Sequence, residues 1–159
     1  MIRLGLLVAA VVLVADQVTK WVILDLVMAP PRTIEVTPFF NLVMVWNRGV
    51  SFGMFANEAD MMRWVLIAVA AAITVVMLVW LKRADRGFVA VALGLIIGGA
   101  VGNVVDRLRF GAVADFLDLH LMGYHWPAFN VADAGITIGV ALLVIDSLFG
   151  RRGAEEAAE

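Results

Sequence analysis

The sequence contains no cysteine, and it has only two histidines. The absence of cysteine excludes disulfides, thiolate metal sites and a cysteine nucleophile. The histidines, His120 and His125, stand in the segment HLMGYH rather than in an HExxH arrangement, so we expect no bound metal. Ser51 lacks a surrounding GxSxG turn, and no glycine-rich loop joins a strand to a helix. The chain therefore does not indicate a serine hydrolase or a phosphate-binding protein, and we expect no cofactor.

Charge is also scarce. Charged residues make up 16% of the 159 residues, the net charge is −2, and no basic patch is present, which argues against a nucleic-acid partner. Instead, 63% of the residues are hydrophobic and the mean hydropathy is +0.96. A soluble domain is nearer to half apolar. The composition predicts one integral membrane domain that covers residues 1–159.

Four segments are apolar over roughly the 20 residues that a membrane-spanning helix needs. They cover about residues 4–27, 64–81, 88–105 and 131–149. The first resembles a signal peptide at its start, but apolar character resumes after Lys20, so we expect it to be retained as a span. The third carries Gly94, Gly98 and Gly102 at helical spacing, which favours close packing against a neighbouring helix.

The cations predict the orientation of these spans. The segment KRADRG joins the second span to the third, and short cation-rich loops stay in the cytoplasm. Both termini are then cytoplasmic, and the loops at about 28–63 and 106–130 are external. In the first of these, TIEVT and FFNLVMVWN have strand composition and are separated by Pro38. We predict an all-α membrane protein of four transmembrane helices, with a small β-sheet cradle in the first external loop.

This orientation gathers the polar residues at one level, near the outer surface. Asp16 and Lys20 lie one helical turn apart and are expected to form an ion pair. The others at this level are Asn47, Arg48, Asn103, Asp106, Arg107, Asp115, Asn130 and Asp133. Ionisable residues at membrane depth usually face a bundle interior or a water-filled cavity. Asp146 is the exception, and we place it at the cytoplasmic interface. A purely structural reading is an ion-pair cluster that ties the helices together.

Asp115 and Asp133 are the carboxylates least explained by local pairing, because neither has a cation beside it in the sequence. Two carboxylates that share a site hold one proton between them. The ionised member can then take a proton from water while the protonated member donates to a carbonyl, which is aspartic peptide hydrolysis. The spacing does not show that the two meet. A proton-coupled or ion-conducting protein, and a structural subunit that binds a partner helix, remain alternatives.

Five segments resemble, in the same order, the sequence blocks of the lipoprotein signal peptidase (signal peptidase II) family. They are DQVTK (16–20), NRGVSFGMF (47–55), GGAVGNVVDR (98–107), VADF (113–116) and FNVAD (129–133). The family consists of bacterial inner-membrane aspartic endopeptidases that cut diacylglyceryl-modified prolipoproteins just before the lipidated cysteine. Ala114 departs from the resemblance, because the family often has valine or another branched residue at this position.

The resemblance implies that Asp115 and Asp133 are the catalytic pair. The residues that it implies bind substrate or support the site are Asp16, Lys20, Asn47, Gly49, Asn103, Asp106, Arg107, Asn130 and Ala132. The implied partners are a lipid-modified prolipoprotein substrate and membrane lipid, and one chain is expected to suffice as a monomer. The implied location is the bacterial inner membrane, with the active site near the outer, periplasmic surface.

Overall fold

The computed structural model describes residues 1–49 and 56–149. Within these residues, α1 (Ile2–Trp21) continues into the short π-helical turn η1 (Val22–Val27), and α2 (Ala56–Arg83), α3 (Gly87–Phe110) and α4 (Val131–Phe149) follow. All four long helices have the length and composition to cross a membrane, which confirms the predicted spans. Residues 50–55, with Ser51 and the end of the NRGVSFGMF segment, and the tail at 150–159 lie outside the described residues.

The predicted end of the third span is wrong. The α3 helix runs to Phe110 rather than to 105, so Asp106 and Arg107 lie in the helix and not in an external loop. Gly111 ends the helix in a left-handed conformation (φ +76°), and its N–H donates to the Arg107 carbonyl (3.1 Å). Hydropathy placed the boundary too early, because the polar residues of the last turns are satisfied inside the protein.

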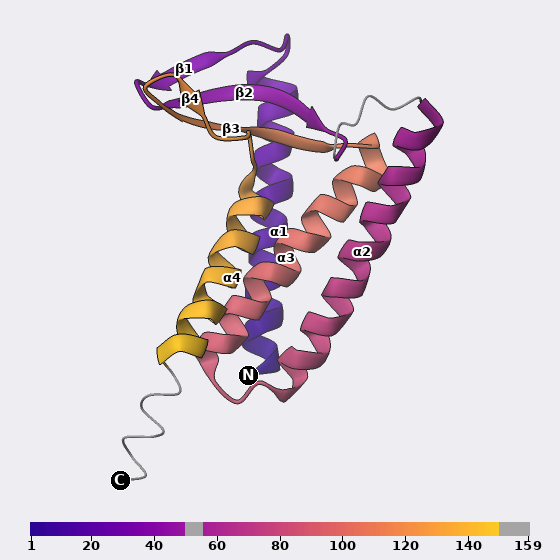
Figure 1. The fold of residues 1–159 in the computed structure, drawn as a ribbon, viewed down its shortest axis with the longest axis vertical. Coiled ribbons are helices and arrows are strands. Elements are labelled where there is room, and N and C mark those ends of the chain that lie inside the picture. The colour runs from indigo at the N-terminus through magenta and orange to yellow at the C-terminus, as the bar shows by residue number, and fades with distance from the viewer. Residues whose placement is uncertain (50–55, 150–159) are drawn as a thin grey trace.

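The α3 helix is the centre of the bundle (Figure 1). In its most apolar 18-residue stretch, 61% of the residues of α3 are buried inside the protein, whereas 6% are buried in the corresponding stretch of α2. Its glycines let the neighbouring backbones approach, as predicted: a Cβ at Gly98 would lie 2.5 Å from the Ala9 carbonyl oxygen of α1. On another face, a Cβ at Gly99 would collide with the carbonyl of Ala132 in α4. The close contacts fix α1 and α4 against α3.

An antiparallel sheet of order β1-β2-β3-β4 lies at one end of the bundle. Its strands are β1 (Ile34–Thr37), β2 (Phe40–Asn47), β3 (Val113–Leu121) and β4 (Tyr124–His125). The first two strands are those predicted for the first loop, and the sheet is extended by β3 and β4 from the second loop. Pairing between segments some 70 residues apart leaves no local pattern in the sequence.

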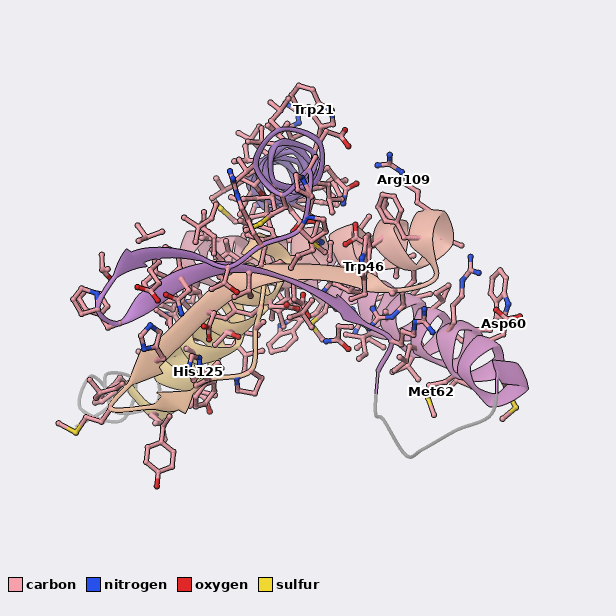
Figure 2. The ribbon with its side chains drawn as sticks, turned by 90° about the horizontal axis from the view of Figure 1, so that it is seen from above. Trp21, Trp46, Asp60, Met62, Arg109 and His125 are labelled. Atoms are coloured by element: carbon pink, nitrogen blue, oxygen red, sulfur yellow. The ribbon has the colours of Figure 1, made fainter. Side chains whose placement is uncertain are left out.

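The sheet packs on the end of the helices opposite the turn between α2 and α3 (Figure 1). Phe116 of β3 packs with Ile23 and Met28 in a small apolar core beneath the strands. Seen from above, β2 and β3 cross the end of the bundle, with Trp46 near the end of α3 and His125 at the far end of the sheet (Figure 2). The Trp46 ring lies 5.4 Å from that of Phe110. The catalytic candidate on β3 is thereby held directly above the helices.

The opposite end of the bundle carries the turn between α2 and α3, beside the N-terminus (Figure 1). There Arg86 pairs with Asp146 of α4, with Nη2 2.7 Å from Oδ1. Asp146, which we expected simply to meet the interface, therefore has a partner from another helix. The pair is partly exposed and ties the ends of α3 and α4 together.

Candidate active site

Asn130 and Asp133 form a reciprocal cap at the start of α4. The Asn130 side-chain oxygen accepts the N–H of Asp133 (3.0 Å), and Asp133 Oδ2 accepts the N–H of Asn130 (3.2 Å). This is the geometry of a capping box, with Asn and Asp in place of the commoner Ser and Glu. The Asp133 carboxylate is consequently fixed in the first turn of the helix, where the helix dipole favours a negative charge.

Asp115 lies near the start of β3 and is 1% exposed. Both of its oxygens accept amide hydrogens: Asn130 Nδ2 donates to Oδ1 (2.7 Å), and Asn47 Nδ2 of β2 donates to Oδ2 (2.9 Å). The orientation of Asn47 is fixed in turn by the N–H of Gly49, which donates to its oxygen (2.9 Å). Gly49 has a φ of +99°, a conformation that suits glycine.

Asn130 therefore touches both carboxylates at once, through its side chain to Asp115 and through its backbone to Asp133. Asn103 of α3 completes the connection. Its Nδ2 donates to Asp133 Oδ1 (2.7 Å), and its oxygen accepts Asn130 Nδ2 (3.3 Å) and Lys20 Nζ (3.4 Å). One turn along, Arg107 Nη1 donates to the Asn103 carbonyl (3.3 Å). The two carboxylates from separate elements thus meet around two asparagines.

The environment of Asp115 favours its protonated form. Burial raises its pKa, and the charge of nearby Asp133 raises it further, while the hydrogen bonds from Asn47 and Asn130 and the charge of Lys20 oppose both effects. The net result raises the pKa of Asp115 from 3.8 to about 6. A carboxyl group that holds its proton this far above the ordinary range is suited to donate it in a reaction.

A buried group of charges lies directly behind this pair. Lys20 Nζ is 2.9 Å from Asp16 Oδ2, which confirms the predicted ion pair, and 2.7 Å from Asp106 Oδ2. All three side chains are at most 3% exposed. Asp16 Oδ1 also accepts the N–H of Ala132 (3.0 Å). Asp106 accepts Lys20 and the N–H of Ala114 (3.1 Å).

All eleven residues that the family resemblance implied belong to one hydrogen-bonded network. They are Asp16, Lys20, Asn47, Gly49, Asn103, Asp106, Arg107, Asp115, Asn130, Ala132 and Asp133. Sequence reasoning missed Gln17, whose Nε2 donates to Asp16 Oδ2 (3.1 Å) and to Asp106 Oδ1 (3.0 Å). Its position inside the DQVTK segment was the available signal.

A second polar group lies at the far end of the sheet. Asp118 of β3 accepts His125 Nδ1 and Asn41 Nδ2, each at 2.9 Å, and the rings of His125 and His120 stack at 4.8 Å. Although burial alone would raise it, the pKa of Asp118 is lowered by these two hydrogen bonds and by the histidine charges. Among residues 1–49 and 56–149, no group of three or more acidic or histidine side chains is arranged to hold a metal ion.

Comparison with known proteins decides the family. A family model described as Signal peptidase (SPase) II matches residues 8–149. The chain belongs to the signal peptidase II family. It is 46% identical to the lipoprotein signal peptidase of Methylobacterium sp. (strain 4-46), over 97% of this chain and 94% of the relative. It is 48% identical to that of Sphingopyxis alaskensis, over 92% and 86%.

A solved structure described as a bacterial membrane enzyme, at 1.9 Å resolution, has the same fold as this signal peptidase II family member. The TM-score is 0.78 and the identity is 34%, over 91% of this chain and 92% of the other. A second such structure, at 2.3 Å, gives 0.76 and 33%, over 91% and 87%. The chain is therefore a membrane-embedded peptidase, and the alternatives of an ion-conducting protein and of a structural subunit are set aside.

Proposed function

We propose that Asp115 and Asp133 are the catalytic pair of an intramembrane aspartic endopeptidase that cleaves lipid-modified prolipoproteins just before the lipidated cysteine. The observation that carries this proposal is the position of Asn130, which hydrogen-bonds both carboxylates, at 2.7 and 3.2 Å. Because one residue reaches both acids, they lie close enough to share a proton and a water molecule. Family membership supplies the class of reaction.

The two carboxyl groups differ in burial, since Asp115 is buried and Asp133 is partly exposed, and this supports a division of roles. Asp133 accepts N–H donors from Asn103 and Asn130, and these stabilise a negative charge on it. Asp115 is buried and its pKa is raised to about 6, so it is the better holder of the shared proton. Asp133 then removes a proton from the attacking water, and Asp115 donates its proton to the scissile amide.

Arg107 is proposed to orient the substrate. It extends from the same helix as Asn103, is partly exposed, and interacts electrostatically with both Asp115 and Asp133. A guanidinium group there can donate hydrogen bonds to a substrate carbonyl beside the lipidated residue. Arg107→Ala is expected to raise KM or lower kcat for a lipidated substrate, and full cleavage by this variant would contradict the assignment.

The site lies at the level that the substrate requires. It sits where the sheet meets the helices, at the end of the bundle opposite Lys82, Arg83 and Arg86 (Figure 1). Because cation-rich turns stay in the cytoplasm, this arrangement supports a site near the outer surface of the inner membrane, with both termini inside. A lipidated signal helix can present its cleavage point there while its acyl chains stay in the hydrocarbon.

Every side chain of the network comes from one chain, which supports a single membrane domain that acts as a monomer. The proposal also includes no cofactor, because an aspartic pair activates water without one. Substrate and membrane lipid are then the only partners that the reaction needs.

The test is cleavage of a lipidated prolipoprotein peptide by purified protein in detergent. Asp115→Asn and Asp133→Asn are each expected to abolish cleavage while the protein remains folded. The matched control is Asp118→Asn, the same change on β3 at a carboxylate that has no hydrogen bond to the network; it should retain activity. Substantial cleavage by either of the first two variants would remove that residue from the pair. Equal cleavage of the unlipidated peptide would refute the proposed substrate class.

A further inference from the structure

The residues just before the two catalytic candidates are held by carboxylates of the buried group behind them. Asp16 accepts the N–H of Ala132, which precedes Asp133 (3.0 Å). Asp106 accepts the N–H of Ala114, which precedes Asp115 (3.1 Å). Each holding residue therefore fixes the backbone from which one catalytic side chain projects.

The two holding carboxylates are themselves joined by two donors from α1. Lys20 Nζ contacts Asp16 Oδ2 at 2.9 Å and Asp106 Oδ2 at 2.7 Å. Gln17 Nε2 contacts Asp16 Oδ2 at 3.1 Å and Asp106 Oδ1 at 3.0 Å. All four carboxylate oxygens thus have a partner, and the third hydrogen of Lys20 faces the Asn103 oxygen at 3.4 Å.

The space around this group leaves little room for adjustment. Asp16 and Asp106 are fully buried and Lys20 is 2% exposed. A Cβ at Gly102 would lie 2.6 Å from Asp16 Oδ2, so the glycine is what lets this carboxylate approach α3. Because Gln17 and Lys20 are packed tightly between the two carboxylates, a displacement of Asp16 is transmitted to Asp106.

We propose that Gln17 and Lys20 are positioning residues that set the distance between the Asp115 and Asp133 carboxyl groups. Gln17 and Lys20 bridge Asp16 and Asp106, which hold the backbone just before each catalytic aspartate. The spacing of the catalytic pair is therefore determined on the side remote from the substrate. This inference rests on the proposed catalytic role of the two aspartates. Neither positioning residue contacts either catalytic carboxylate by a direct hydrogen bond.

Gln17→Leu is the sharper test, because it removes one bridge without leaving a buried charge unpaired. Since a misplacement of about 1 Å can cost on the order of 100-fold in rate, we expect kcat per folded enzyme to fall by roughly 10-fold with KM nearly unchanged. The control is Thr19→Val on the same helix, whose hydroxyl donates to the carbonyls of Ala15 and Asp16 and to no other group among residues 1–49 and 56–149. It should retain the wild-type kcat.

The pH dependence of kcat separates positioning from folding. The charges that act on the pair are Lys20 and Asp16 of α1, Asp106 and Arg107 of α3, and the partner carboxylate itself. If the pair moves apart in Gln17→Leu, their mutual repulsion weakens, and the interval between the two apparent pKa values of the bell-shaped profile narrows. A variant that merely yields less folded protein keeps the wild-type profile per folded molecule, and that result would overturn the proposal.

Lys20→Met provides a second measurement. If it folds, it should show a larger loss of kcat than Gln17→Leu, with the same narrowing of the profile. If it does not fold, Gln17→Leu alone decides. Asp115→Asn, assayed in parallel, separates the two proposals. Cleavage by Asp115→Asn refutes the catalytic pair. If Asp115→Asn is inactive but Gln17→Leu keeps the wild-type kcat and pH profile, only the positioning role is refuted.

Discussion

Replacing Asp115 with asparagine should stabilise the protein at neutral pH while it abolishes cleavage. The side chain keeps its size but loses a charge that the site holds at a cost. The raised pKa means that the stability associated with this group is present below its ordinary pKa of 3.8 and is lost as the pH rises through about 6. The interval between these two values corresponds to about 3 kcal/mol.

Part of this gain is offset by a lost hydrogen bond. Asn47 and Asn130 each donate an amide hydrogen to Asp115, and an asparagine at this position has only one oxygen to accept them. One donor then faces an NH₂ group, which costs about 1 kcal/mol. The net stabilisation at pH 8 is about 2 kcal/mol, or a rise of about 4–8 °C in the unfolding midpoint for a chain of this size.

The assay is thermal unfolding in detergent, followed by tryptophan fluorescence between pH 4 and pH 8. The midpoint of Asp115→Asn should exceed that of the wild type at pH 8, and the excess should vanish toward pH 4. Asp118→Asn, on the same strand, is the control of opposite sign, because the pKa of Asp118 is lowered. Its deficit should be present across this whole pH range, because the stability that Asp118 contributes is lost only below its ordinary pKa of 3.8. An Asp115→Asn midpoint at or below that of the wild type at pH 8 would refute the reasoning.

Three further outcomes are expected. The alkaline limb of the pH profile of kcat/KM, which reports the free enzyme, should lie near pH 6, where Asp115 loses its proton. The alkaline limb of kcat should lie at a higher pH, because bound substrate buries the acid further. A kcat/KM limb above pH 8 would contradict the assignment. Gly99→Ala should destabilise the folded protein by about 2 kcal/mol or more and reduce cleavage, because the added Cβ meets the Ala132 carbonyl. Gly87→Ala, whose added Cβ would lie 3.7 Å from its nearest neighbour, should be tolerated in the same unfolding and cleavage assays. Arg86→Ala should change stability by at most about 1 kcal/mol and leave kcat unchanged, since its pair is partly exposed and far from the site; a loss of activity would show that the bundle end is coupled to it.

Apolar length and local spacing were sufficient to predict part of this structure. The fourth predicted span, 131–149, coincides with α4, and the spacing of Asp16 and Lys20 produced the expected ion pair. Strands β1 and β2 also fell where their composition indicated. These features share one property, which is that neighbours in the chain determine them.

Features that depend on distant partners were not predictable in the same way. The last turns of α3 look like a loop from hydropathy, and the contacts of Asp106 with Gln17, Lys20 and Ala114 explain why a carboxylate is buried there. The capping box of Asn130 and Asp133 departs from the commoner pair of Ser and Glu, so its residue types did not mark a helix start. Gln17 has no charge to attract notice, and its role depends on a carboxylate 89 residues away.

The balance of charge around the site favours a shared proton on the proposed pair of Asp115 and Asp133. The end of the bundle beneath the sheet contains four network carboxylates but two network cations, namely Asp16, Asp106, Asp115 and Asp133 against Lys20 and Arg107. Lys20 forms its ion pairs with Asp16 and Asp106, so the charges of Lys20 and Arg107 act on the proposed catalytic pair electrostatically, while the groups that hydrogen-bond the pair are neutral amides. Amides hydrogen-bond a carboxylate but do not cancel its charge, so uptake of one proton is the least costly way to reduce the repulsion. Replacing Asn103 with a lysine would cancel that charge directly, and it should therefore lower the pH at which the pair takes up its proton and abolish the acid that the reaction needs.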